Sequence, residues 1–166
     1  IYNISTSIAA ARKIFNISDA NIKNSMKKMR LKGRLEEIKS GKLKNLIGEN
    51  RLIIDGGHNI NSAISISNWV KQQNEKVHLI CGMMNDKPHK EFVNQFENSV
   101  NSITLIDIPN QEGSISKEEF KKKLGNKNIH TAESIEESLL MNNKDKNCIF
   151  LCAGSLYLAG EVLNLN

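Results

Sequence analysis

The chain has 166 residues, 39% hydrophobic and 25% charged, a balance typical of one globular domain that buries a sizeable core. It contains two prolines, and no apolar run approaches the ~18 residues of a transmembrane helix, which argues against both disorder and a membrane protein. The formal net charge is +5, but acids alternate with the lysines and aromatic residues are only 5%. We therefore favour a solvated basic surface that attracts small anions over a nucleic-acid site.

Residues 1–15 lack the continuous apolar region and the small-residue cleavage site of a secretion signal, so we expect a cytoplasmic protein. The odd number of cysteines favours reduced thiols. If residues 148–152 form a strand, Cys148 and Cys152 lie about 13 Å apart on one face, too far for a disulfide or a shared metal ion. Together with Cys81, they are expected to be core thiols.

Two helices are predicted at the start of the chain. In the first, apolar residues recur at spacings of four, three and four, at Ile4, Ile8, Ala11 and Phe15. Ser18 is placed to cap a second helix, which carries Ile22, Met26 and Met29. Residues 35–47 then have a short, extended pattern interrupted by a Ser-Gly turn signal, and this pattern predicts a small hairpin.

Four apolar runs follow, at residues 52–54, 77–81, 103–108 and 148–152. The segments between them mostly have the apolar spacing of helices, and two begin with capping-box spacings, Ser116 with Glu119 and Ser134 with Glu137. Such alternation predicts an α/β fold in which an open, mostly parallel sheet is covered by helices on both faces.

The stretch Asp-Gly-Gly-His-Asn, residues 55–59, ends the first apolar run and precedes a helical pattern. One interpretation is purely structural: the glycines form a tight turn, and Asp55 or Asn59 caps the helix. The functional alternative is a ligand site, because ligands of open α/β sheets bind beyond the carboxyl ends of the strands. Gly82 and Gly154 also follow strand ends, so three polar loops are expected to converge on one rim.

The sequence lacks the usual nucleotide fingerprints. It contains no G-x-G-x-x-G, and the Gly-Lys-Leu of residues 41–43 lacks the earlier glycine and the Ser or Thr of a P-loop. A dinucleotide dehydrogenase and a complete ATPase are therefore disfavoured. If ATP binds to this chain, groups outside it must hold the phosphates.

Several stretches together resemble one family. They are YNISTSIAAA, KGRLEEI, LIIDGGHN, GMMNDKPHKEF and GSLYLAGEVL, in that order along the chain. They resemble the carboxyl-terminal part of folylpolyglutamate synthase, including the bifunctional dihydrofolate synthase form, in the Mur ligase superfamily. The resemblance implies a Rossmann-like C-terminal ligase domain at residues 33–166. It also implies that residues 1–32 are the terminal helices of a central ATPase domain and a linker.

The resemblance also implies an activity. The family uses ATP and Mg²⁺ to phosphorylate a folate carboxylate, and the amine of L-glutamate then attacks the acyl phosphate. By resemblance, three residues bind ATP. Asn3 contacts the region of the base, Arg34 reaches the phosphates, and Asp55 binds the nucleotide. His58, as a catalytic residue, and Ser155 match the glutamate side. Asp86 and Lys87 match a loop that we assign to the same side.

Further expectations follow from the resemblance. The metal ligands and the P-loop are expected in an N-terminal ATPase domain of the same enzyme, and no metal site is expected in this chain. We expect the enzyme to act as a monomer and this chain to be inactive by itself. Gly57 and Ile60 replace the family's usual alanine and proline. Alternatives are another Mur-type amino-acid ligase or a non-catalytic ligand-binding module of this fold.

Each assigned residue also has a purely structural interpretation. Asn3 and Ser155 are placed to cap helices, Arg34 to lie on the surface at a hinge, and His58 to be a turn histidine. The other histidines, His78, His89 and His130, belong to no recognisable constellation.

Overall fold

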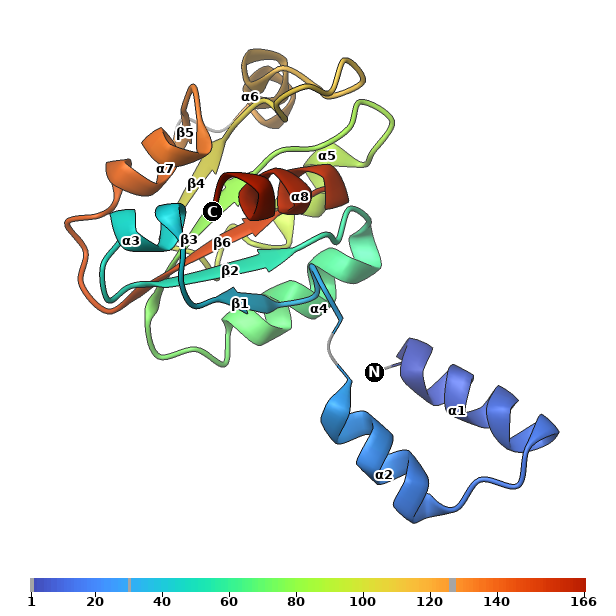
Figure 1. Cartoon of the computed structure of the whole chain (residues 1–166). Coiled ribbons are helices and arrows are strands. Elements are labelled where there is room, and N and C mark those ends of the chain that lie inside the picture. The colour runs from blue at the N-terminus through green and yellow to red at the C-terminus, as the bar shows by residue number, and fades with distance from the viewer. Residues whose placement is uncertain (1, 30, 126–127) are drawn as a thin grey trace. The chain divides into compact units, whose positions relative to one another are not determined.

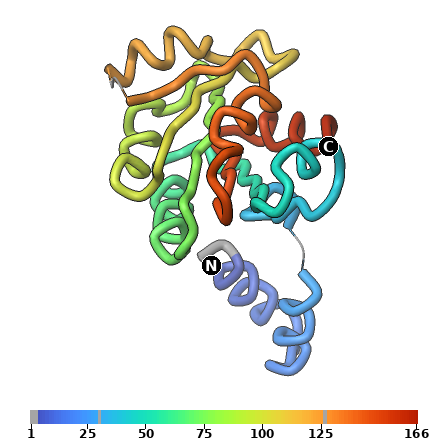
Figure 2. The backbone as a smooth tube through the Cα atoms, turned by 90° about the vertical axis from the view of Figure 1, so that its left-hand side faces the viewer, coloured from blue at the N-terminus to red at the C-terminus, as the bar shows by residue number. Residues whose placement is uncertain are grey.

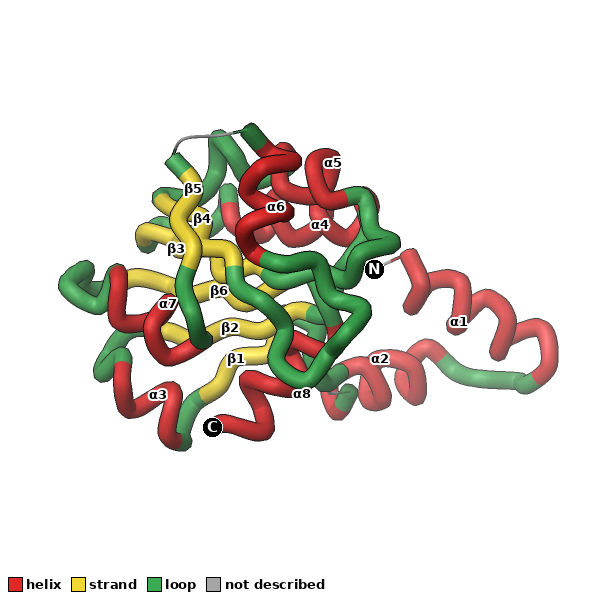
Figure 3. Tube along the Cα trace, turned by 90° about the horizontal axis from the view of Figure 1, so that it is seen from above, coloured by secondary structure: helices red, strands yellow, loops and turns green. Residues whose placement is uncertain are grey.

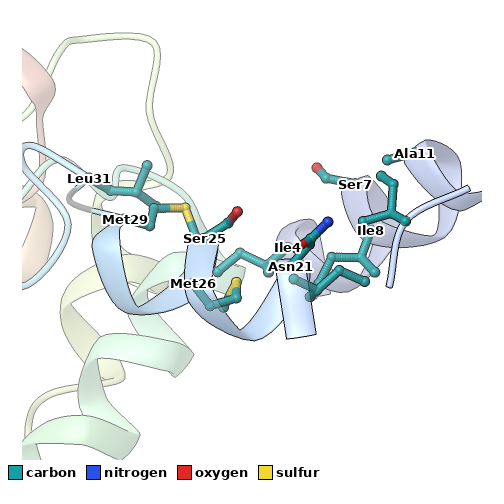
Figure 4. A pocket seen from close by; sticks show the side chains of 11 residues that line it. Ile4, Ser7, Ile8, Ala11, Asn21, Ser25, Met26, Met29 and Leu31 are labelled. Atoms are coloured by element: carbon teal, nitrogen blue, oxygen red, sulfur yellow. The ribbon is translucent and has the colours of Figure 1, made fainter. Parts of the chain in front are cut away.

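The structure is a computed structural model that describes residues 2–29, 31–125 and 128–166, and the chain divides into two units, Ile1–Lys32 and Gly33–Asn166. In the first unit, α1 (Tyr2–Ile14) and α2 (Asp19–Lys28) form as their apolar spacing predicts. Ser18 caps α2 by accepting a hydrogen bond from the Asn21 amide at 3.2 Å. Apolar side chains of both helices line a groove within this unit (Figure 4). That the unit ends an ATPase domain stays a prediction.

In the second unit, the described residues form a six-stranded sheet in the order β1-β2-β6-β3-β4-β5 (Figure 1). The strands are β1 (Glu36–Ile38), β2 (Arg51–Asp55), β3 (Lys76–Cys81), β4 (Ser102–Leu105), β5 (Ile129–Thr131) and β6 (Cys148–Ala153). Only β1 is antiparallel to its neighbour, so the predicted mostly parallel sheet is confirmed. Because β6 lies between β2 and β3, the carboxyl ends of these three strands are adjacent.

Helices cover both faces of the sheet, as predicted, and successive strand residues point to opposite faces. One core cluster joins Leu79, Leu151 and other strand residues to α4 (Ile60–Val70), α5 (His89–Asn94) and α6 (Lys117–Leu124). The other joins Ile80, Phe150 and their neighbours to α3 (Lys42–Leu46), α7 (Ile135–Met141) and α8 (Leu156–Leu165). Figure 3 shows α3 and α8 on one side of the strands and α4 and α5 on the other.

The predicted helix caps also form. The Oγ of Ser116 accepts a hydrogen bond from the Glu119 amide at 3.3 Å, and the Oγ of Ser134 accepts one from the Glu137 amide at 3.0 Å. Each bond supplies a partner for one of the amides that a helix leaves unpaired at its first turn.

The hairpin predicted for residues 35–47 is wrong. β1 pairs with β2, and the segment between them contains α3. Leu43 and Ile47 are one helical turn apart and both are buried, while Gly41 and Gly48, with φ of 115° and 58°, bound the helix. Figure 2 shows α3 (cyan) beside α8 (red), and the Lys42 amide donates to the Asn166 carbonyl at 2.9 Å. Burial of this short helix against α8 therefore overrides the extended pattern.

The three cysteines are buried and free, which confirms the prediction of core thiols. Burial raises the pKa of the Cys148 thiol to about 11. No helix in the described ranges is long and apolar enough to cross a membrane.

Candidate functional site

Asp55 is the last residue of β2, and its carboxylate binds the backbone on both sides. Oδ1 accepts a hydrogen bond from the Gly57 amide at 2.7 Å, and Oδ2 accepts one from the Leu35 amide at 2.9 Å. Burial raises the pKa of Asp55 above its ordinary value, while the two amides and the nearby Arg34 oppose that rise. Asp55 is only 5% exposed, so its carboxylate holds the turn and the preceding segment together.

Arg34 lies between two residues in the left-handed region, Gly33 with φ of 62° and Leu35 with φ of 43°. This segment is attached to the end of β2, since the Gly56 amide donates to the Gly33 carbonyl at 2.7 Å. The Arg34 guanidinium lies 3.7 Å from Oδ1 of Asp55, and 47% of the side chain is exposed. Backbone geometry thus fixes the position of Arg34 while its cationic group remains accessible.

His58 begins the loop that enters α4. Its Nδ1 lies 3.2 Å from the Gly56 carbonyl oxygen, and because a carbonyl only accepts, Nδ1 carries the hydrogen. In a neutral ring, Nε2 then holds the lone pair and is able to accept a proton. The adjacent Asn59 caps α4 in a capping box with Ser62. The structural interpretation of this loop therefore holds for Asn59, and the contact with Gly56 gives His58 the structural role of a turn histidine, with Nε2 left for a further role.

Ser155 is the N-cap of α8, and its Oγ accepts a hydrogen bond from the Tyr157 amide at 3.1 Å. The loop that carries Ser155 is hydrogen-bonded to the loop that follows β2, because the Gly154 amide donates to the Gly57 carbonyl at 3.1 Å. Gly154 has φ of 114°, and a Cβ there would lie 2.7 Å from the carbonyl oxygen of Gly82. The loops that follow β2, β6 and β3 are thus closely packed, as predicted.

The third loop, residues 82–87, carries Asp86 and Lys87. The Lys87 ammonium binds the Asp86 carboxylate at 2.7 Å and holds the pKa of Asp86 below its ordinary value. An electrostatic contribution from His58 lowers that pKa further by a smaller amount. The loop that carries this ion pair therefore belongs to the same rim as the loops of His58 and Ser155.

The structure brings most of the predicted site residues together. Arg34 and Asp55 lie side by side at the end of β2, and the loops that carry His58, Ser155 and Asp86 meet at the rim. The side chain of Asn3 lies outside the described residues. In the described parts of the chain, no three His, Cys, Asp or Glu residues are grouped so as to hold a metal ion.

Sequence reasoning missed His89, which contacts the third loop at the Met84 carbonyl. It also missed residues 113–115, which pair with that loop from another part of the chain. No motif in the sequence marks either contact.

Comparison with known proteins identifies the family to which this domain belongs. Residues 33–156 match the family described as Mur ligase, glutamate ligase domain. This match covers most of the chain, which therefore belongs to the Mur ligase family through that domain. A curated relative is the dihydrofolate synthase/folylpolyglutamate synthase of Buchnera aphidicola subsp. Schizaphis graminum, 24% identical over 166 residues. The alignment covers 96% of this chain but 38% of the relative, so the chain spans well under half of that protein.

Solved structures share the fold. Escherichia coli FolC in complex with DHPP and ADP matches 98% of this chain and 38% of its own, with a TM-score of 0.76 and 20% identity. Mycobacterium tuberculosis folylpolyglutamate synthase complexed with ADP and AMPPCP matches 90% of this chain and 35% of its own, with a TM-score of 0.75 and 15% identity. The predicted resemblance and the Rossmann-like fold are thereby confirmed.

Proposed function

We propose that this chain is the C-terminal part of an ATP-dependent ligase that adds L-glutamate to a folate. The observation that carries the proposal is the packing of three strand-end loops, which bring His58, Ser155 and Asp86 to one rim. The Mur ligase family and the folate-ligase relatives support it. The chain would work in the cytoplasm as a monomer, joined to a P-loop ATPase domain of the same enzyme.

The glutamate side of the site would consist of His58, Ser155, Asp86 and Lys87. ATP would supply the phosphoryl group that activates the folate carboxylate as an acyl phosphate. The glutamate nitrogen would attack the acyl carbon, the bond to phosphate would break, and phosphate would leave. His58 suits the removal of the amine proton because its Nε2 bears the lone pair when Nδ1 donates to Gly56.

A negatively charged substrate also fits the remaining groups. The positive end of α8 and the Ser155 hydroxyl suit a glutamate carboxylate, and the Lys87 ammonium offers a cation on the neighbouring loop. The protein would mainly position the reactants and stabilise charge.

The nucleotide side would consist of Asn3, Arg34 and Asp55. The half-exposed guanidinium of Arg34 suits phosphate oxygens. Asp55 fits ribose hydroxyls less directly, since each of its oxygens already accepts a backbone amide. We place the Mg²⁺ ligands in the ATPase domain, as the resemblance to the family implies.

A kinetic comparison of the two substrates tests this proposal. The chain would replace the matching part of one of the structural relatives, and Arg34→Ala, His58→Ala and Ser155→Ala would be compared with the unaltered chimaera. We expect His58→Ala and Ser155→Ala to raise the glutamate KM more than the ATP KM. Arg34→Ala should lower kcat/KM for ATP by the equivalent of about 2–4 kcal/mol.

Two results would count against the proposal. An active chimaera in which all three variants keep normal kinetics would return these residues to purely structural roles. Binding of another amino acid in preference to glutamate would favour a different Mur-type ligase.

A further inference from the structure

His89 is a buried histidine that the roles proposed above do not use. It is the first residue of α5 and is 6% exposed. Its ring packs edge-to-face on Phe120 of α6, with the ring centroids 5.1 Å apart and an interplanar angle of 61°. Phe120 is fully buried, so the position of this imidazole is fixed by the core.

The ring makes a hydrogen bond to the rim loop. Its Nε2 lies 3.0 Å from the carbonyl oxygen of Met84, and because that oxygen only accepts, Nε2 carries the hydrogen. Burial lowers the pKa of His89 below its ordinary value, which favours the neutral ring with a single N–H. The same carbonyl accepts the Lys87 amide at 3.2 Å, so His89 supports the turn that presents Asp86 and Lys87.

The rest of this loop is held by the backbone of residues 113–115. The Asn85 amide donates to the Gly113 carbonyl at 2.9 Å, and the Ile115 amide donates to the Met83 carbonyl at 3.0 Å. These bonds hold the loop up to Asn85. After Asn85, the Lys87 carbonyl accepts the His89 amide at 2.9 Å, and the His89 ring holds the Met84 carbonyl that closes the turn.

We propose that His89 is a positioning residue, which fixes the Met84 carbonyl and thereby holds in place the turn that presents Asp86 and Lys87 at the rim. It touches no reacting atom and acts through the loop. The inference rests on the proposed function only in assigning His58 and Asp86 to the glutamate side. The anchor itself is a property of this chain without substrate.

Backbone amide exchange measured by NMR on the whole chain tests the anchor. His89→Leu removes the N–H donor but keeps apolar bulk against Phe120, while His89→Gln keeps a donor of similar reach. In His89→Leu we expect the Asn85 and Lys87 amides to exchange about fivefold to tenfold faster than in the wild type, which is the effect of losing one hydrogen bond. The Ile106 amide is the internal reference for these exchange rates. His89→Gln should restore most of the protection.

His78→Leu is the matched control. It removes another buried histidine, from β3, whose ring contacts Ser102 and Asp145. It should leave the ratio of Lys87 to Ile106 exchange unchanged. Equal ratios in His89→Leu and the wild type would overturn the anchor.

A spectroscopic measurement reports on positioning itself. Asp86→Asn should change the imidazole ¹H and ¹⁵N shifts of His58 in the wild type and in His89→Gln. In His89→Leu this effect should fall by at least about half, because a loosened loop no longer holds Asp86 in place. An Asp86→Asn effect of equal size in all three backgrounds would overturn the proposal. Neither measurement involves ATP, folate or glutamate, so failure of the proposed function would leave both results standing.

Discussion

His78 lies in β3 and is 4% exposed, with a partner for each ring nitrogen. Nε2 donates to the Asp145 carboxylate at 3.1 Å, so in the neutral ring Nδ1 accepts from the Ser102 hydroxyl at 2.8 Å. Lys76 binds the other oxygen of Asp145, also at 3.1 Å. This cluster ties the loop before β6 to the sheet with a neutral imidazole.

Stability should therefore fall on mild acidification. Burial lowers the pKa of His78 below 6.5, although Asp145 partly opposes this shift. Below pH 6.5 the unfolded chain thus binds more protons than the folded chain, and the free energy of unfolding decreases as the pH falls towards the folded pKa. Burial lowers the pKa of His89 in the same direction, so both residues contribute to the slope.

Urea unfolding between about pH 7.5 and about pH 5 measures this effect around the ordinary histidine pKa. His78→Gln removes the titrating group and should flatten the pH dependence. A slope unchanged by His78→Gln would show that the proton uptake occurs elsewhere.

Single residues also show how far the sequence predicted the site. The strand-end glycines predicted that the loops of Asp55, His58 and Ser155 would meet, and these loops are packed together, because a parallel sheet places strand-end loops at one edge. The partner of Asp55 was not predictable, since Leu35 reaches it only through an unusual positive φ. His89 was missed for a similar reason: its role depends on a carbonyl and on Phe120, and neither contact leaves a sequence motif.

At the scale of elements, the capping box of α4 offers a direct stability test. The Asn59 side chain accepts the Ser62 amide at 2.9 Å, and the Ser62 hydroxyl accepts the Asn59 amide at 3.0 Å. Asn59→Ala should lower the free energy of unfolding by about 0.5–2 kcal/mol, measured by urea denaturation. Asn61→Ala, in the exposed first turn of the same helix, is the control and should change it by less than about 0.5 kcal/mol. Equal losses in the two variants would contradict a special role for the cap.

Elements with long apolar runs were the predictable ones. β2, β3, β4 and β6 each contain several consecutive buried residues and were found, as were the helices with capping boxes. β5 was missed because only Ile129 of its three residues is buried, which is too short a pattern to recognise. The helix α3 was misread because burial against α8, rather than local propensity, decides its conformation.

At the scale of the whole molecule, the two units differ in their dependence on the sheet. Every residue of the two buried clusters lies after Gly33. A chain of residues 33–166 should therefore unfold cooperatively, with a Tm within about 4 °C of the intact chain in calorimetry. Loss of the cooperative transition would show that residues 1–32 are required for the fold.

The chain alone should not turn over substrates. Its sequence contains no Gly-x-x-x-x-Gly-Lys-Ser/Thr loop to cradle phosphates. We expect no phosphate release when it is mixed with ATP, a folate and glutamate, and only weak binding of ATP in calorimetry. Sustained phosphate release that is lost in Arg34→Ala would contradict this expectation.

The backbone geometry at Gly154 limits which mutations of its codon the protein tolerates. Its added Cβ would meet backbone, the Gly82 carbonyl, and its φ of 114° disfavours any other residue. Glycine alone among the standard amino acids lacks a Cβ, so every missense change at this codon introduces one. At Gly56 the atoms nearest to an added Cβ are the Cδ2 and Cγ of Leu156, which belong to a side chain and not to the backbone. At Gly154, unlike Gly56, an added Cβ therefore meets backbone that cannot move aside, so we expect any missense change at this codon to distort the packing of the rim loops.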